Sequence, residues 1–273
     1  GDCPNDTIGC PTISFLPKFL GGQGIGLGTH PFGQDDIGRD YFALVMKGTQ
    51  RSLSVMIIIG SIAATLGVVV GSIAGFYRGR VDAILMRFVD FMITIPVIII
   101  GSVVGYRYGN LGAVFLALLL GLFAWTGLSR LVRGEFFSLR EEAFVEADRA
   151  FGFSKPRIIF RHLLPNTMSP IVVAFTVNIA IFIIAEAGLS FLGLGVPVTT
   201  PTWGNLLTAA QNPVVVNEYW WLWVFPALAI AIFVLGVNFV GDGLRDVLDP
   251  RHKSLITKNK WKTMVLSRLG RKK

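Results

Sequence analysis

Residues able to do chemistry are few in this chain, and they do not form a catalytic or metal-binding pattern. The histidines, His30, His162 and His252, are scattered along the sequence, and no nucleophile–base or metal-ligand spacing occurs. The phosphate-binding pattern G-x-x-x-x-G-K-[ST] is also absent, so the sequence has no motif for hydrolysing ATP. We therefore expect no active site, no metal site and no cofactor bound by this chain itself.

The chain has two cysteines, Cys3 and Cys10, in an N-terminal segment rich in Gly, Pro, Asn and Asp. The membrane orientation derived below places this segment outside the cell, where a disulfide persists. Closing so small a loop would stabilise the segment by about 2.5 kcal/mol if the effect is chain entropy. We favour a Cys3–Cys10 disulfide. Two free thiols are the alternative, and a metal site is disfavoured because no histidine lies nearby in the sequence.

The longest charged stretch between apolar ones runs over residues 138–166, SLREEAFVEADRAFGFSKPRIIFRHLLPN. Apolar residues recur at three- and four-residue spacing near its start, and charged residues fill the other side, which predicts one amphipathic helix. The apolar stripe of this helix consists of Phe136, Leu139, Ala143, Ala147 and Ala150.

Gly152 interrupts this pattern, and a second short helix should follow it. Ser154 suits the N-cap, and Pro156 suits the first turn, where its missing N–H costs nothing. The residue before a proline disfavours helix, so the second helix should end near Leu164, before Pro165. Two short helices at an angle form a rigid knob suited to docking on a partner. A solvated loop that lies on the membrane surface is the alternative.

The composition is that of an integral membrane protein. Charged residues make up 15% of the chain and its mean hydropathy is +0.61, whereas about 25% of the residues of an ordinary soluble domain are charged. The net charge of +8 would suggest nucleic acid in a soluble chain. Here the basic residues flank apolar spans, fill the central loop and crowd the tail after Pro250. They therefore mark the cytoplasmic face. The basic tail is expected to lie against anionic lipid, and nucleic-acid binding by this tail is disfavoured.

Five apolar segments are long enough to cross a hydrocarbon core of about 30 Å. They cover residues 53–76, 82–105, 111–131, 169–192 and 221–240. The predicted fold class is all-α, a polytopic membrane helical bundle, and the second segment should kink at Pro96. The five spans start outside the cell and end in the cytoplasm. If the N-terminus of the protein is cytoplasmic, a sixth span must precede them. We therefore expect sequence to be missing before Gly1.

Two carboxylates lie inside the predicted spans, where a charge is costly and often functional. Asp90 has Arg87 one turn earlier, which favours a local ion pair over substrate or proton handling. Glu186 is interpreted as a pin for a helix end rather than as a selector of substrate. A stripe of small residues that permits close helix packing, within this bundle rather than with a partner subunit, consists of Ala63, Gly67, Gly71 and Gly75.

The segments outside the spans complete the predicted organisation. Residues 203–211 should form a short helix against the outer membrane surface, next to an aromatic belt that consists of Trp220, Trp221 and Trp223. The predicted parts of the chain are an extracytoplasmic segment at 1–50, a transmembrane domain at 51–245 with its cytoplasmic loop at 134–168, and a basic tail at 246–273.

The cytoplasmic loop resembles the EAA loop of ABC-importer permeases, a helical hairpin that docks into a groove on an ATP-hydrolysing subunit. The residues that carry this resemblance, and that it implies are ATPase-docking, are Glu146, Ala147, Gly152, Ile158, His162, Leu164 and Pro165. Asp148 departs from the pattern, because it places a charge at the third position of the EAA triplet. GLSFLGLG at 188–195, PTWG at 201–204 and GDGLRDVLDPR at 241–251 resemble permeases for dipeptides, oligopeptides and nickel.

The resemblance implies a permease of type I ABC-importer fold that forms half of a translocation pore for peptides or a related small solute. It also implies a second homologous permease, two ABC ATPase subunits that bind ATP and Mg, and an extracytoplasmic solute-binding protein. The chain would be a multi-pass protein of a bacterial or archaeal plasma membrane and would not itself be an enzyme. An ion-coupled secondary transporter and a non-transporting membrane scaffold are the alternatives. The sequence identifies neither the solute nor the residues that bind it.

Overall fold

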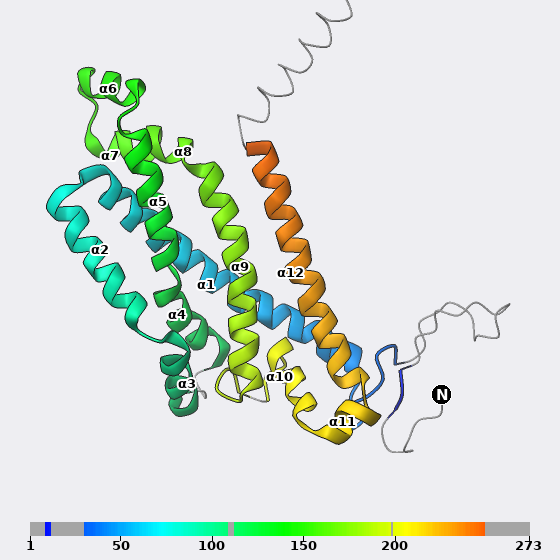
Figure 1. Cartoon of the computed structure of the whole chain (residues 1–273). Coiled ribbons are helices and arrows are strands. Elements are labelled where there is room, and N and C mark those ends of the chain that lie inside the picture. The colour runs from blue at the N-terminus through cyan, green and yellow to red at the C-terminus, as the bar shows by residue number, and fades with distance from the viewer. Residues whose placement is uncertain (1–8, 12–29, 109–111, 198, 249–273) are drawn as a thin grey trace, which may run out of the picture.

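The computed structural model describes residues 9–11, 30–108, 112–197 and 199–248. Within these ranges the regular secondary structure is helical, apart from an isolated bridge between Gln34 and Asp40 (Figure 1). Four helices are long and apolar enough to cross a membrane, and a pair of helices bent by 63° makes up to a fifth span. The all-α membrane bundle is thus confirmed, and the sixth span, which would precede Gly1, stays a prediction.

The first span is α1 (Tyr41–Tyr77), a helix of 37 residues. It begins well before the predicted start at residue 53, because the Asp40 carboxylate caps it and accepts hydrogen bonds from the N–H groups of Phe42 and Ala43. It ends in a tight turn, where Arg78 (φ 53°) and Gly79 (φ 58°) both have left-handed backbone.

The small-residue stripe of α1 packs against α5 (Thr126–Leu139). A Cβ added at Gly71 would lie 2.5 Å from the carbonyl oxygen of Ser129, and one added at Gly75 would lie 2.5 Å from Cβ of Phe136. The two helix backbones therefore lie so close together that only glycine, which has no Cβ, fits at these positions. The predicted use of this stripe within the same bundle is confirmed.

The next spans are both interrupted. The pair α2 (Gly79–Thr94) and α3 (Val97–Tyr108) bends at Pro96, as predicted. The pair α4 (Gly112–Ala124) and α5 forms one span over Gly112–Leu139 with a break at Trp125. Neither this break nor the extension beyond residue 131 was predicted.

Two long helices, α9 (Met168–Phe191) and α12 (Trp221–Leu248), complete the spans. Between them in the chain lie α10 (Trp203–Leu207), η4 (Thr208–Gln211) and α11 (Pro213–Glu218), which confirms the helix predicted over 203–211. The predicted aromatic belt is partly wrong. Trp220 is 46% exposed, but Trp221 is 2% exposed and belongs to the buried cluster that contains Tyr41. Its indole N–H donates to the Gln34 carbonyl at 3.2 Å, so its polar edge points into the protein.

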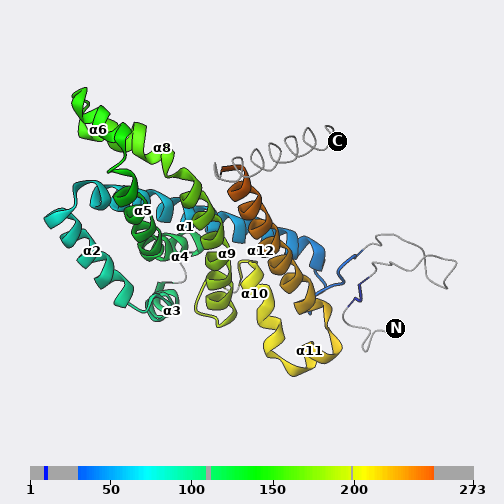
Figure 2. The same cartoon turned by 45° about the horizontal axis from the view of Figure 1, so that its top comes forward.

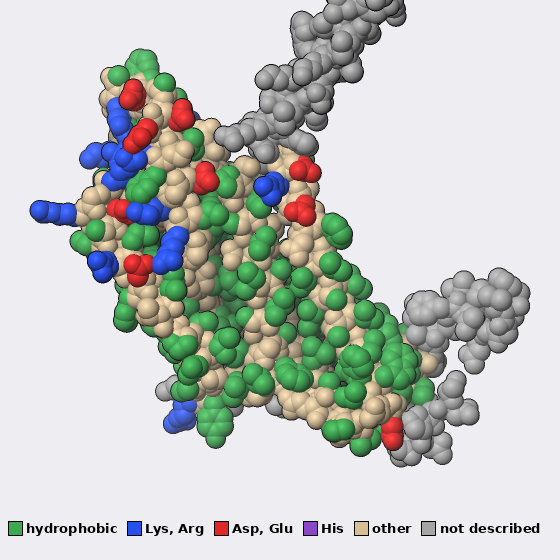
Figure 3. All heavy atoms as spheres, viewed as in Figure 1, with side chains coloured by type: hydrophobic (Ala, Val, Ile, Leu, Met, Phe, Trp, Pro, Cys, Tyr) green, Lys and Arg blue, Asp and Glu red, His purple; other side chains and the backbone are tan. Residues whose placement is uncertain are grey.

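The two ends of the bundle differ in charge. Most charged side chains on the face shown in Figure 3 gather at the end that carries α6 (Ala143–Ala150), and apolar side chains cover much of the rest. The helices α10 and α11 lie at the opposite end in both views (Figures 1 and 2). The positive-inside rule predicts that the charged end is cytoplasmic and that the α10–α11 end is outside.

Candidate coupling hairpin and outer pocket

The candidate coupling hairpin protrudes from the charged end of the bundle (Figures 1 and 2). It consists of α6, α7 (Lys155–Arg157), η3 (Ile158–Leu163) and α8 (Leu164–Asn166). The single amphipathic helix predicted from Phe136 to Ala150 is wrong. Helix α5 ends at Leu139, and the extended backbone of Glu142 (ψ 147°) separates it from α6.

The joint between α5 and α6 is held against the α1–α2 turn, which is why one continuous helix does not form. Arg140 donates a hydrogen bond to the Phe76 carbonyl, and Glu141 forms an ion pair with Arg78 at 2.6 Å. Burial of its guanidinium lowers the pKa of Arg140, and the charges of Arg149 and Arg78 lower it further. The joint therefore links the position of the hairpin to α1 and α2.

A hydrophobic cluster lies beneath the hairpin and joins it to the bundle. Val145, Ile158 and Leu163 of the hairpin are at most 1% exposed and pack with Phe136 of α5 and Phe76 of α1. Helix α6 therefore does not bury the predicted alanine stripe. Ile158, one of the residues assigned to ATPase docking, supports the hairpin from inside, where each such side chain contributes about 1.5–3 kcal/mol.

The second half of the hairpin contains a π-helical turn. Gly152, with φ 76°, forms the turn that precedes it, and Ser154 and Pro156 take the predicted N-cap and first-turn positions. The predicted stop before Pro165 is wrong, because the helical run continues to Asn166. The N–H of Leu164 donates five residues back, to Ile159, and this wider turn accommodates a proline that has no N–H to donate.

Asp148, which departs from the EAA pattern, points into the hairpin. Its Oδ2 lies 2.6 Å from Nδ1 of His162, and the two side chains are 11% and 25% exposed. The His162 ring also packs edge-on against Phe153, with ring centroids 5.5 Å apart. The pair links α6 to η3, so the unusual acid contributes to the inside of the hairpin rather than to its outer surface.

The exposed surface of the hairpin combines predicted residues with an aromatic side chain that was not singled out from the sequence. Leu164 is half-buried, and the predicted residues on the surface are Glu146, Ala147, Gly152 and Pro165. Phe151 is 78% exposed at the turn, next to Gly152. The sequence does contain a signal that Phe151 is exposed, namely an aromatic residue beside a turn glycine in a charged loop. A residue at a hairpin tip has few neighbours that could bury it.

Two ion pairs tie α2 to α5. Arg133 holds both carboxylate oxygens of Asp82, at 2.5 and 2.6 Å, and Arg130 donates to Asp90 at 2.5 Å. The predicted pairing of Asp90 with Arg87 is wrong, because α5 lies alongside α2 and Arg130 reaches across. These pairs couple α2 to the helix that leads into the hairpin.

Glu186 lies in a buried cluster of hydroxyl groups. It is 1% exposed and accepts hydrogen bonds from Ser190 at 2.9 Å and Ser52 at 3.4 Å. The Ser52 oxygen in turn accepts the backbone N–H of Trp203 at 3.2 Å. The cluster joins α1, α9 and α10, as expected of a structural pin.

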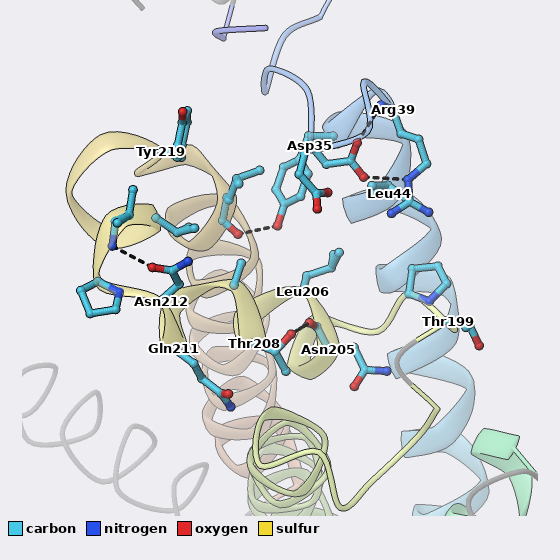
Figure 4. A pocket seen from close by; sticks show the side chains of 18 residues that line it. Asp35, Arg39, Leu44, Thr199, Asn205, Leu206, Thr208, Gln211, Asn212 and Tyr219 are labelled. Atoms are coloured by element: carbon cyan, nitrogen blue, oxygen red, sulfur yellow. Dashed lines mark hydrogen bonds and ion pairs between the residues drawn. The ribbon is translucent and has the colours of Figure 1, made fainter. Parts of the chain in front are cut away.

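An outer pocket of about 990 Å³ opens between the residues that precede α1 and the α10–α11 segment. Figure 4 shows Asp35 and Arg39 on one side of this pocket and Gln211 and Asn212 on the other. Asp35 is 5% exposed, and Arg39 donates to it from its backbone N–H and from Nε, both at 2.7 Å. Asp36 also lines the pocket and is exposed, with no ion pair among the described residues. The pocket thus offers solvent a carboxylate above a largely apolar floor.

The remaining predicted sites lie mostly outside the described residues. Cys10 is partly buried against the cluster that contains Tyr41 and Trp221, but Cys3 is not among the described residues, so their pairing stays a prediction. Most of the basic tail, from residue 249 on, is likewise outside them. No group of His, Cys, Asp or Glu that could hold a metal occurs in the part of the chain that the structure describes.

Comparisons with known proteins agree with this architecture. The family described as "Binding-protein-dependent transport system inner membrane component" matches residues 67–254. A putative peptide permease of Brucella ovis is 41% identical over 222 residues, which cover 81% of this chain and 73% of that protein. A glutathione transport system permease of Pectobacterium atrosepticum is 38% identical over 225 residues, covering 82% and 74%. Among solved structures, the inward-facing MetNI methionine ABC transporter matches with a TM-score of 0.61 at 19% identity, covering 76% of this chain and 97% of that one.

Proposed function

Because the chain belongs to the family of binding-protein-dependent transport inner membrane components, and is the permease of an ABC importer, we propose that it forms half of a pore for peptides. The other half is a second, homologous permease. The proposed cargo is taken from the relatives named as peptide and glutathione permeases. This chain is not catalytic, and we assign the binding of ATP and Mg to two partner ATPase subunits.

The observation that carries the proposal is the hairpin, which has an exposed tip on a firmly packed base. Phe151 and Glu146 face solvent, while Val145, Ile158 and the Asp148–His162 pair hold the hairpin together. A rigid knob of this kind transmits a push from a partner without deforming. When ATP closes the ATPase pair, the hairpin moves with it, and the joint and ion pairs carry this motion to α1, α2 and α5.

A chain with Glu146→Lys is expected to lose the ATPase subunits while it keeps the second permease. Glu146 is exposed in the first turn of α6, so the change reverses a surface charge without disturbing the buried base. The measurement is purification from the native membrane in mild detergent, with every co-purifying protein identified. The control is Glu218→Lys, an exposed charge reversal at the outer end. Recovery of ATPases unaffected by Glu146→Lys, or the same loss with Glu218→Lys, would contradict docking through this surface of the hairpin.

We further propose that the outer pocket receives a loop of the solute-binding protein. It lies at the end opposite to the hairpin, it is larger than one small side chain requires, and its walls are fixed by the Asp35–Arg39 pair and by the hydrogen bond from Tyr41 to the Leu222 carbonyl. The carboxylate of Asp36 suits a basic side chain on that loop.

Asp36→Lys is expected to weaken the response to the solute-binding protein, because a like charge then faces the basic side chain. The concentration of solute-binding protein that gives half-maximal ATPase stimulation should rise about tenfold. The reason is electrostatic, so the difference should shrink at high salt. Glu218→Lys, which reverses a charge on the same face but outside the pocket, is the matched control. Equal effects of the two variants, measured in proteoliposomes, would show that only the general charge of this face matters.

A further inference from the structure

A second cavity, of about 270 Å³, lies within the membrane-spanning part of the bundle, at the level where two spans are interrupted. The α2–α3 bend, the α4–α5 break and α9 all contribute to its wall. Residues that line it from these three places are Ile93 and Ile95, Phe123 and Thr126, and Phe182 and Ala185.

The interruptions favour a position of this wall inside the assembled transporter rather than against lipid. Pro96 has no N–H, and the chain bends by 63° there, so the last carbonyls of α2 lose the donors of a continuing helix. The Thr94 hydroxyl donates to the Phe91 carbonyl at 2.7 Å in place of one of them. The bond that Ile95 N–H makes to the Met92 carbonyl is 3.4 Å long. Unsatisfied backbone is costly in hydrocarbon, and irregular backbone at membrane depth occurs where it is buried in protein or lines a cavity.

The same interruptions divide the two spans into halves. On the cytoplasmic side, the Asp82–Arg133 and Asp90–Arg130 ion pairs hold α2 to α5. On the outer side, α3 packs against α4. The cavity lies between these halves and takes wall residues from both breaks. A movement of the hairpin that carries α2 and α5 relative to α3 and α4 therefore changes the shape of the cavity.

The chemistry of the wall selects an uncharged, apolar group. No Asp, Glu, Lys or Arg lines the cavity, and the Thr126 hydroxyl already donates to the Phe123 carbonyl at 3.3 Å. A charged group would lose its hydration there without gaining a partner. The volume is also below that of common small-molecule sites, which are about 300–1,000 Å³. It suits one large aliphatic or aromatic side chain and not a whole peptide.

We infer that this cavity receives an apolar side chain of the transported peptide as the peptide passes the two helix breaks. The inference rests on the proposed function, because it requires peptide cargo. It assigns to Phe182 and Ala185 a part in selecting the cargo. A cavity whose shape depends on the angle between the two halves binds the side chain in one state of the transporter and releases it in the other.

Ala185→Phe fills the cavity and tests the inference. In proteoliposomes containing the whole transporter with its solute-binding protein, uptake of labelled trileucine is expected to fall about tenfold and that of triglycine less than about twofold. Recovery of the partner subunits with this chain should not change. The matched control is Ala231→Phe, an exposed position on α12 that does not line the cavity.

Each other outcome contradicts the inference in a recognisable way. Equal loss of both peptides, or no loss of either, would mean that the cavity does not select side chains; no loss is also the result expected if it holds a lipid acyl chain. Loss of the second permease from the purified complex would mean that the cavity holds a side chain of that subunit. A wild-type complex that transports neither peptide would instead contradict such tripeptides as cargo, and with them the part of the proposed function on which the inference rests.

Discussion

A chain with Phe151→Asp is expected to lose its ATPase subunits and to support almost no solute uptake. Phe151 is 78% exposed at the hairpin turn, where a docking groove would bury its ring. Truncating a buried aromatic anchor typically costs 2 kcal/mol or more, and a carboxylate left unpaired in the groove adds to this, so binding should weaken by about 100-fold or more. The measurement is ATPase recovery with the purified permease, together with ATP-dependent uptake.

The control for this variant is Tyr106→Asp, which replaces an aromatic residue that is 84% exposed. Tyr106 lies in α3, near the outer end, so Tyr106→Asp should leave both ATPase recovery and uptake close to those of the wild type. If Phe151→Asp retained its ATPases, the ring would not be an anchor, and docking would depend on the charged residues of α6 alone.

Gly71→Ala is expected to lower the stability of the whole bundle. The added Cβ would lie 2.5 Å from the Ser129 carbonyl oxygen and 2.7 Å from Cβ of Val132, so α1 and α5 must separate. Overpacking of this kind costs about 1–3 kcal/mol. Gly134→Ala is the matched control, because it changes a helical glycine of α5 that has no heavy atom within 4 Å of an added Cβ. That change should be neutral or stabilising by about 0.5–1 kcal/mol.

Thermal unfolding in detergent distinguishes these two glycine variants. The unfolding temperature of Gly134→Ala is expected to equal or exceed that of the wild type. The unfolding temperature of Gly71→Ala should lie clearly below it. Equal midpoints would show that the α1–α5 contact relaxes without cost.

The features that could be predicted from sequence are those set by local physics. Long apolar runs give spans because lipid leaves backbone groups no partner outside the helix, and Pro96 bends its helix because it has no N–H. The Gly71 stripe indicated close packing because small side chains recur at four-residue spacing. The outer helix at 203–211 was likewise evident from a short segment between turn residues.

The features that were missed depend on contacts between distant parts of the chain. The break after Leu139 exists because Arg140 and Glu141 reach the α1–α2 turn, and no helical periodicity reports this. Asp90 pairs with Arg130 rather than with its sequence neighbour Arg87 for the same reason. In the hairpin, the sequence indicated which residues belong to it but not which face is buried, because burial is decided by the bundle beneath.

The ion pairs between α2 and α5 also bear on how the protein is made. Asp82 and Asp90 leave the ribosome first, and their partners follow 51 and 40 residues later. An unpaired carboxylate in a membrane helix is costly, so the contacts that stabilise α2 are complete only when α5 lies beside it. We therefore expect α2 and α5 to pack together only after both arginines have been synthesised.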